Sequence, residues 1–184
     1  MNFKFDVRIT EEDYINFNKF TSISSPYGKK SMKGIRMILA VIGILLILHS
    51  FLTSGFTTAG IGAAVVYALI IAALQLLLIP YMRFSIKMNV EAIKKSGSLP
   101  YSEEAGMEFC ESYFVETTPL TKTATRYEKI QNVYEIEKRY VYIYVSTISA
   151  FIIPATAFSS LSEYEDFVSF IKTKCESFTT LKKI

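Results

Sequence analysis

The sequence predicts an α+β membrane protein in which a hydrophobic helical hairpin precedes a β-rich C-terminal part. Three observations support this: two long apolar stretches, residues that favour β-strands after residue 106, and an amphipathic helix near the C-terminus. We therefore expect a two-helix transmembrane hairpin joined to a cytoplasmic antiparallel β-meander, an open barrel capped by the C-terminal helix.

The two apolar stretches cover residues 37–51 and 60–79, and neither contains Asp, Glu, Lys or Arg. A membrane-spanning helix needs about 20 mostly apolar residues. The second stretch has this length, and the first reaches it over residues 34–53 if Arg36 extends to the interface. A water-soluble alternative would need two helices that are apolar on every face, with little remaining chain to cover them.

Basic residues lie on the outer flanks of both apolar stretches, whereas the connecting loop, residues 53–59, is uncharged. The residues before the first helix are Lys29, Lys30, Lys33 and Arg36, and those after the second are Arg83, Lys87, Lys94 and Lys95. Short segments rich in Lys and Arg stay in the cytoplasm, so we predict a multi-pass protein of the cell membrane with both termini cytoplasmic. The four residues before the hairpin are also candidate contacts for anionic lipid headgroups.

Small residues recur at every fourth position of the second apolar stretch. They are Gly60, Ala64, Ala68 and Ala72. This spacing lets another backbone approach closely inside a membrane. The neighbour is either the first helix, with Ala40 and Gly43, or a second copy of the chain in a homo-oligomer, and we favour packing within the hairpin. Gln75 is expected to hydrogen-bond across the helices.

The segments on either side of the hairpin have their own patterns. Residues 3–9 alternate apolar and polar side chains, which predicts a strand, and Thr10 with Asp13 is close to a capping box that begins a helix. Pro80 should end or kink the second helix. The predicted division is 1–33 for the N-terminal strand and helix, 34–80 for the hairpin, 81–96 for a juxtamembrane helix and 97–184 for the β domain. The sequence leaves open whether the N-terminal strand joins the C-terminal sheet.

The C-terminal part is predicted to contain five strands and one helix. The strands are expected near residues 107–115, 121–127, 130–136, 139–146 and 148–153. The helix begins at Ser160, with Glu163 completing a capping box and an apolar stripe of Leu161, Tyr164, Val168 and Ile171, with Phe167 beside it. Tyr140, Tyr142 and Tyr144 share one face of a strand. This aromatic face is a candidate partner-binding surface, unless the N-terminal strand and helix cover it.

The order of several motifs resembles the YcxB-like family of bacterial membrane proteins. The motifs are Ile9-Thr-Glu-Glu-Asp-Tyr14, Ser25-Pro-Tyr-Gly-Lys-Lys30 before the hairpin, and Ile152-Ile-Pro-Ala-Thr-Ala-Phe158 before the last helix. Residues 127–158 also look like a bacterial pleckstrin-homology-like domain, in which a meander ends in a strand and a C-terminal helix. The resemblance implies that fold for the cytoplasmic part and brings no catalytic or binding residues with it.

Residues suited to catalysis or cofactor binding form no recognisable set. The carboxylates Glu103, Glu104, Glu108, Glu111 and Glu116 are interpreted as a solvated surface, and the single histidine, His49, lies in the hairpin. Cys110 and Cys175 have no metal-binding spacing and are expected to be free thiols. We therefore predict no enzyme, no metal and no cofactor.

The charge distribution points to a membrane surface. The formal charge of +3 is carried by residues 1–36, which hold seven basic and four acidic side chains. Such a segment suits an anionic membrane surface and not a nucleic acid. The leading hypothesis is a non-catalytic module anchored at the inner membrane, whose β domain binds an unknown protein partner or scaffolds an assembly. The alternatives are protection against membrane-active peptides or envelope stress, and a small oligomeric transport or channel component.

Overall fold

The computed structural model describes residues 2–97 and 101–181 of the chain. The chain divides into two compact units, Met1–Asn18 with Val90–Ile184, and Lys19–Asn89. We call the first the β unit and the second the hairpin unit.

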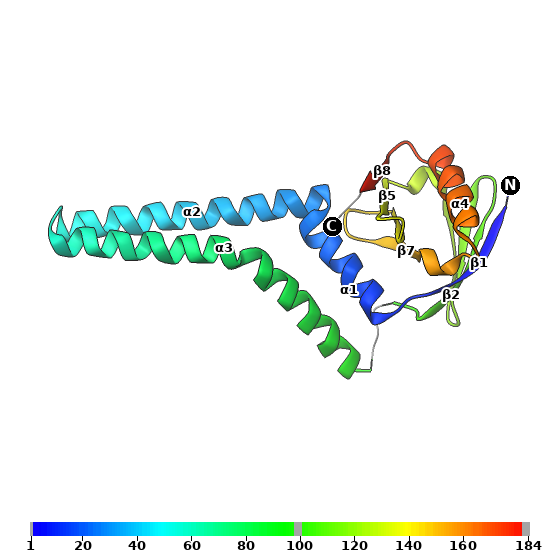
Figure 1. The fold of residues 1–184 in the computed structure, drawn as a ribbon, viewed down its shortest axis with the longest axis horizontal. Helices are drawn as coiled ribbons and strands as arrows, with labels where there is room; N and C mark the ends of the chain where they lie inside the picture. Colours follow the sequence, from blue (N-terminus) through cyan, green and yellow to red (C-terminus); the bar gives the residue numbers. More distant parts are fainter. Residues whose placement is uncertain (1, 98–100, 182–184) are drawn as a thin grey trace. The chain divides into compact units, whose positions relative to one another are not determined.

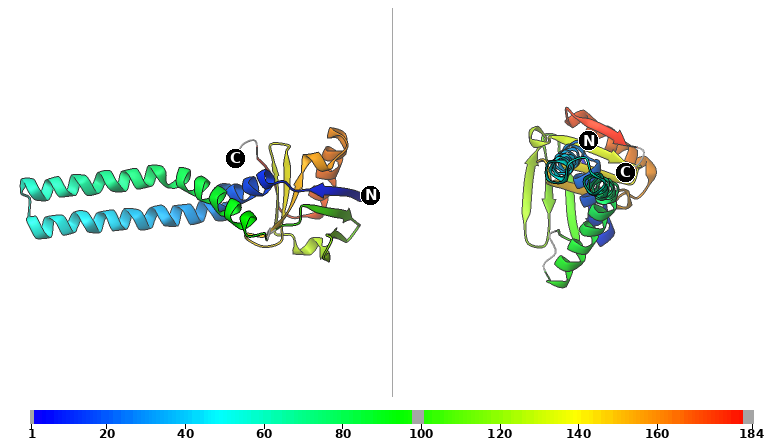
Figure 2. Two further views of the ribbon diagram at one scale, coloured as in Figure 1. Left: turned by 90° about the horizontal axis from the view of Figure 1, so that it is seen from below. Right: turned by 90° about the vertical axis from the view of Figure 1, so that its left-hand side faces the viewer.

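The hairpin unit is built from α2 (Pro26–Ser54) and most of α3 (Thr58–Lys95). The end of α3, from Val90, belongs to the β unit. The two helices run side by side along the hairpin (Figures 1 and 2). Both are long and apolar enough to cross a membrane. Helix α3 continues through Pro80 and is bent beyond the hairpin (Figure 1), as expected for a proline that removes one backbone hydrogen bond.

Helix α2 starts earlier than the apolar stretch suggests. Ser25 is its N-cap, with its Oγ accepting a hydrogen bond from the Gly28 amide at 2.9 Å, and Pro26 is the first helical residue. Serine is favoured at the N-cap because its hydroxyl accepts from a free amide, and proline is favoured at the first helical position because its missing amide hydrogen is not needed there. The Ser-Pro pair therefore begins this helix.

The two helices of the hairpin are in contact at Gly43 and at Gln75. A Cβ atom at Gly43 would lie 2.9 Å from Cγ1 of Ile71, so glycine is what allows the helices to approach here. Gln75 donates a hydrogen bond from Nε2 to the Arg36 carbonyl at 2.8 Å, as predicted. This bond also places Arg36 and Gln75 at the same level of the hairpin.

The β unit contains two four-stranded sheets. The first has the order β1-β2-β3-β4, formed by β1 (Phe3–Arg8), β2 (Glu104–Phe109), β3 (Tyr113–Thr117) and β4 (Lys122–Arg126). The second has the order β7-β6-β5-β8, formed by β5 (Asn132–Ile136), β6 (Tyr140–Tyr144), β7 (Ala150–Pro154) and β8 (Phe178–Leu181). All pairings are antiparallel except that of β5 with β8.

The N-terminal strand joins the C-terminal part. Phe3 lies opposite Phe109 and Arg8 opposite Glu104 in the β1–β2 ladder. The hairpin is thus inserted between two neighbouring strands of one sheet. Helix α1 (Glu11–Lys19) follows β1 and leads through a π-helical turn, η1 (Phe20–Ser24), into α2. Its predicted capping box is present, since Thr10 and Asp13 each accept a hydrogen bond from the other's amide.

One strand prediction is wrong and one strand was missed. The predicted strand 107–115 is two strands, β2 and β3, joined by a turn that includes Cys110, and β8 was not predicted at all. The turn consists of Cys110, Glu111 and Ser112 and contains no Gly, Pro, Asn or Asp, the residues that most strongly mark a turn. The single meander is accordingly two sheets.

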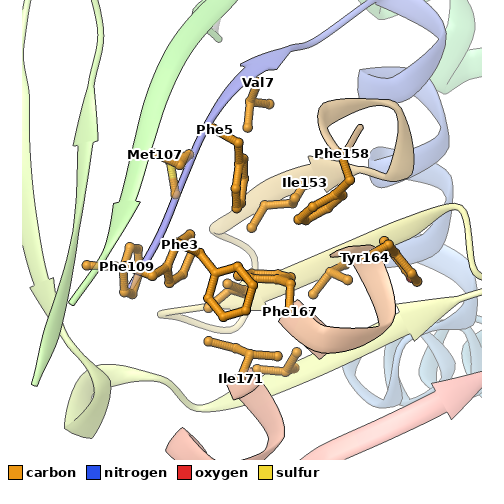
Figure 3. Close-up of a cluster of buried hydrophobic side chains, with 14 of the residues drawn as sticks. Phe3, Phe5, Val7, Met107, Phe109, Ile153, Phe158, Tyr164, Phe167 and Ile171 are labelled. Carbon is orange, nitrogen blue, oxygen red and sulfur yellow. The ribbon is translucent and has the colours of Figure 1, made fainter. Parts of the chain in front are cut away.

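The core of the β unit lies between the sheets and helix α4 (Leu161–Lys174). Figure 3 shows Phe3, Phe5 and Phe109 of the first sheet meeting Phe158, Tyr164 and Phe167. Ser160 caps α4 as predicted, accepting from the Glu163 amide at 3.2 Å. The buried stripe is Tyr164, Phe167 and Ile171, whereas Leu161, which was assigned to it, is 61% exposed.

Candidate functional site

The tyrosines proposed as a partner-binding face are buried. Tyr140, Tyr142 and Tyr144 have at most 6% of their surface exposed. Helix α1 packs on them: the Phe17 ring lies edge-on to Tyr142 at 5.4 Å between centroids, and Tyr140 donates a hydrogen bond to Asp13 at 2.8 Å. The alternative in which the N-terminal helix covers this face is therefore the one found.

The four small residues of α3 divide into two pairs. Gly60 and Ala64 are buried, whereas Ala68 and Ala72 are exposed. Residues four apart on an α-helix are offset by about 40°, so a row of them turns away from a neighbouring helix within a few turns. Only the first pair lies in the buried seam of the hairpin.

The candidate lipid-contacting residues are accessible. Lys29, Lys30, Lys33 and Arg36 are exposed, on the first turns of α2. Cations are disfavoured near the N-terminus of a helix because the amide groups there already carry partial positive charge. Helix stability therefore does not account for this cluster, which is consistent with an interaction outside the hairpin.

A cleft that the sequence did not predict lies at one end of the β unit. It has a volume of about 510 Å³ and is formed by α1, the end of β3 and the turn between β6 and β7. Its apolar walls include Phe17, Val145, Ile148 and Phe151. Ile9 and Tyr101 also line it, so the cleft borders both the segment that leaves β1 for the hairpin and the segment that returns to β2.

Glu116 lines this cleft. Glu116 shares a face of β3 with Phe114, which is fully buried in the core, and is paired across the sheet with Met107. Side chains two apart on a strand point to the same side, so Glu116 extends the core-facing row to its open end. It is half-buried, and within the described parts of the chain no hydrogen bond or ion pair engages its carboxylate.

Glu116 therefore departs from the predicted solvated surface, whereas Glu103, Glu104, Glu108 and Glu111 are exposed as expected. Burial raises the pKa of the Glu116 carboxyl above its ordinary value. The signal was present in the sequence, because Glu116 follows Phe114 at the spacing of one strand face. This spacing predicts the face on which Glu116 lies only if β3 is recognised as a strand separate from β2.

The other acidic groups near the cleft are partly compensated. Glu11 pairs with Lys94 at 2.6 Å and Glu104 lies 3.9 Å from Arg8. The Tyr101 ring lies 4.6 Å from that of Tyr14 between centroids, and the pKa of Tyr101 is raised by burial and by the charge of Glu103. Among the described residues that line the cleft, Glu116 is the one with a charged side chain.

Glu135 is the contrasting case, a carboxylate that the fold satisfies. It is 7% exposed, and accepts hydrogen bonds from the hydroxyls of Tyr164 at 3.3 Å and Thr180 at 2.9 Å. These bonds connect β5 with α4 and β8, which indicates a structural role. Glu116 has no such donors in the described part of the chain, so a binding role is open to it.

Replacing Glu116 with glutamine is expected to raise the melting temperature of the full chain at pH 7.5 by about 1–3 °C. A carboxyl whose pKa is higher in the folded state stabilises the fold only while protonated, so its contribution is lost as pH rises through that pKa. The gain should disappear below about pH 4, where the carboxyl is protonated in both states. Thermal unfolding followed by circular dichroism at several pH values measures this.

The matched control is Glu108→Gln, which removes the same charge from an exposed position on β2. Its melting temperature should stay within about 1 °C of the parent, as is usual for surface substitutions. An equal gain from both substitutions would show that overall charge, and not the environment of Glu116, is responsible.

Potential metal ligands do not gather in the described part of the chain, where no three His, Cys, Asp or Glu side chains could hold an ion. Cys110 and Cys175 are free thiols, and burial raises the pKa of Cys175. The candidate site is thus a cleft with apolar walls and, among its described lining residues, one uncompensated carboxylate.

These features define a class of protein: a β domain of two sheets closed by a helix, with an apolar helical hairpin inserted between its first two strands. Residues 109–171 match the model of the YcxB-like protein family. This match agrees with the resemblance to the YcxB-like family noted in the sequence. The match runs from the end of β2 into α4 and includes Glu116. No curated protein and no solved structure matches the chain.

Proposed function

We propose that this chain is a non-catalytic, membrane-anchored protein whose β unit binds a protein partner at the cytoplasmic surface of the cell membrane. The observation that carries the proposal is an uncharged, exposed apolar hairpin inserted within one sheet of a folded β unit. If the hairpin spans the membrane, the β unit is tethered to it through both the segment before α2 and the segment after α3.

The exposure of the hairpin supports the membrane location. In the most apolar 18-residue segment of each helix, only 11% of α2 and 6% of α3 is buried within the protein. Large side chains such as Leu52 and Leu76 are 86% and 79% exposed. Contiguous apolar surface of this extent is unfavourable in water and is the expected exterior of a helix in lipid.

The charges support the orientation. Because Arg36 and Gln75 lie at one level, the basic residues before and after the hairpin are at the same end of it. The uncharged part of α2, residues 37–54, is about 27 Å long at a rise of about 1.5 Å per residue. This length is close to the hydrocarbon thickness of about 30 Å. Lys29, Lys30, Lys33 and Arg36 would then lie at the headgroups of the inner leaflet.

The order of elements in the β unit supports a pleckstrin-homology-like fold. Strands β1 to β7 follow one another in two antiparallel sheets, and α4 comes after the seventh strand. With this interpretation the hairpin occupies the connection between the first and second strands. The described lining of the cleft offers one carboxylate, and the single histidine, His49, is in α2, so the chemistry of the cleft suits binding better than catalysis.

Cysteine labelling in intact cells tests the anchoring. In a chain with Cys110 and Cys175 replaced by serine, Thr57→Cys at the hairpin turn should react with a membrane-impermeant maleimide. Thr123→Cys, on exposed β4, should react only after the cells are opened. The reverse pattern would refute the orientation, and recovery of the chain in the soluble fraction would refute the anchoring.

Photocrosslinking in cells tests partner binding. A photoreactive residue replacing Ile148, which is 62% exposed and lines the cleft, should give a recurrent protein adduct. The same residue at Thr123, outside the cleft, is the control. Identical adducts at both positions, or only self-adducts at Ile148, would contradict binding of a partner in the cleft.

A further inference from the structure

We propose that the cleft binds a juxtamembrane segment of another membrane protein, through a lysine or arginine flanked by apolar side chains. This inference rests on the proposed function, because it takes the β unit to be held at the cytoplasmic surface. It identifies the chemistry of the partner and the residue that recognises it.

The walls of the cleft suit the apolar part of such a segment. Phe17 of α1 lies on one side, and Ile148 and Phe151 come from the β6–β7 turn and β7. Pockets of about 300–1,000 Å³ with apolar walls and few polar groups are typical binding sites, and this cleft is within that range. Tyr14 and Tyr101 form an aromatic pair in the lining, and the faces of such rings also attract cations.

The charge of the cleft selects a cationic occupant. Glu116 is half-buried with no donor or cation engaging it in the described residues, and an anionic ligand would add to this unfavourable burial. A lysine or arginine would instead compensate it with a charge-assisted hydrogen bond. Glu103 adds a second negative charge nearby, whereas the neighbouring cations Lys94 and Arg8 are already beside Glu11 and Glu104.

The connection of the cleft to the hairpin indicates where the occupant comes from. The lining includes Tyr14 and Phe17 of α1, the helix that leads into α2, and Tyr101, which follows α3. A hairpin embedded in the membrane therefore tethers the β unit that contains the cleft to the membrane. The segments that adjoin membrane helices on the cytoplasmic side are enriched in lysine and arginine next to apolar residues. Such a segment is complementary to the cleft in both charge and polarity.

A binding experiment with the full chain tests this inference. The protein is placed in nanodiscs of zwitterionic phosphatidylcholine, and the fluorescence anisotropy of a labelled peptide that alternates lysine with leucine is measured. We expect saturable binding above that of empty nanodiscs. Glu116→Gln should weaken binding about tenfold, the scale of one hydrogen bond to a charged group. Glu108→Gln should leave it within about twofold.

Two further measurements distinguish binding in the cleft from binding elsewhere on the protein surface. Ile148→Ser, a change at an exposed turn, should weaken binding several-fold by removing part of the apolar wall. A peptide with glutamate in place of lysine should not bind. Equal effects of Glu116→Gln and Glu108→Gln, or binding no stronger than to empty nanodiscs, would overturn the proposal. Loss of folding cannot account for weak binding by Glu116→Gln, because this variant is expected to be at least as stable as the parent.

The outcome separates the inference from the proposed function. Failure of the peptide to bind, together with the expected cysteine labelling, would reject the cationic partner and leave the membrane anchor intact. Peptide binding together with a reversed labelling pattern would support a cationic ligand for the cleft. It would contradict the proposal that this ligand is a cytoplasmic juxtamembrane segment.

Discussion

Replacing Phe167 with alanine is expected to lower the free energy of unfolding of the β unit by about 3–5 kcal/mol. Phe167 of α4 has no exposed surface, and its ring contacts Phe3, Phe5, Phe109 and Phe158, with centroid distances from 4.9 to 5.5 Å. Truncation removes these contacts and leaves a cavity that rigid neighbouring rings cannot fill. Because stabilities of whole domains are about 5–15 kcal/mol, the variant should be close to unfolding at growth temperature.

Chemical denaturation of the full chain, followed by circular dichroism at wavelengths that report β-structure, measures this loss. Leu161→Ala on the same helix is the control, because its side chain is 61% exposed and its truncation should cost less than about 0.5 kcal/mol. The Phe167 contacts also join the first strand of the chain to its last helix. Similar stabilities of the two variants would mean that β1 and α4 do not share one core.

The substitution Leu69→Lys is expected to impair integration of the hairpin into the membrane, at a cost of about 2.5–3.5 kcal/mol. Leu69 is 65% exposed near the middle of the uncharged part of α3. In water, an exposed leucine can be exchanged for lysine with little effect. In the hydrocarbon core, the same change places a charge far from both interfaces, so the sign of the result identifies the environment of the hairpin.

The measurement is the fraction of protein that remains in membranes after alkaline carbonate extraction, together with its steady-state amount. Leu120→Lys is the control, since it makes the same exchange at a residue that is 93% exposed on the β3–β4 turn. A Leu69→Lys variant that resists extraction as well as the Leu120→Lys variant would contradict burial of α3 in lipid.

Local sequence patterns predicted the individual elements well. The helices α1 and α4, their capping residues Thr10 and Ser160, and the apolar stretches of α2 and α3 are as expected. The Gln75 hydrogen bond was also predicted, although its acceptor, the Arg36 carbonyl, was not. Such features depend on residues within one or two turns of each other, or on the composition of one helix, and one sequence contains that information.

The candidate site was predicted less well, because its residues are brought together by pairing over long distances in the chain. Glu116 looked like one of several surface carboxylates, and becomes part of a cleft only when α1 and the β6–β7 turn close around the end of β3. The sequence left open whether Tyr142 is accessible, and it is buried because α1 packs across β6. The spacing from Phe114 indicates the face of β3 on which Glu116 lies, but no local pattern indicates that α1 packs on β6 or closes the cleft.

The sequence by itself determined the apolar hairpin, its basic flanks, the helix starts and the β-rich character of the C-terminal part. Each follows from local polarity and backbone preference. Only the tertiary structure decided that β1 pairs with β2 across the inserted hairpin, that β8 lies parallel beside β5, and that Glu116 lines a cleft. The physical reason is that strand pairing uses backbone groups common to all residues, so the partner of a strand is selected by packing of the whole core.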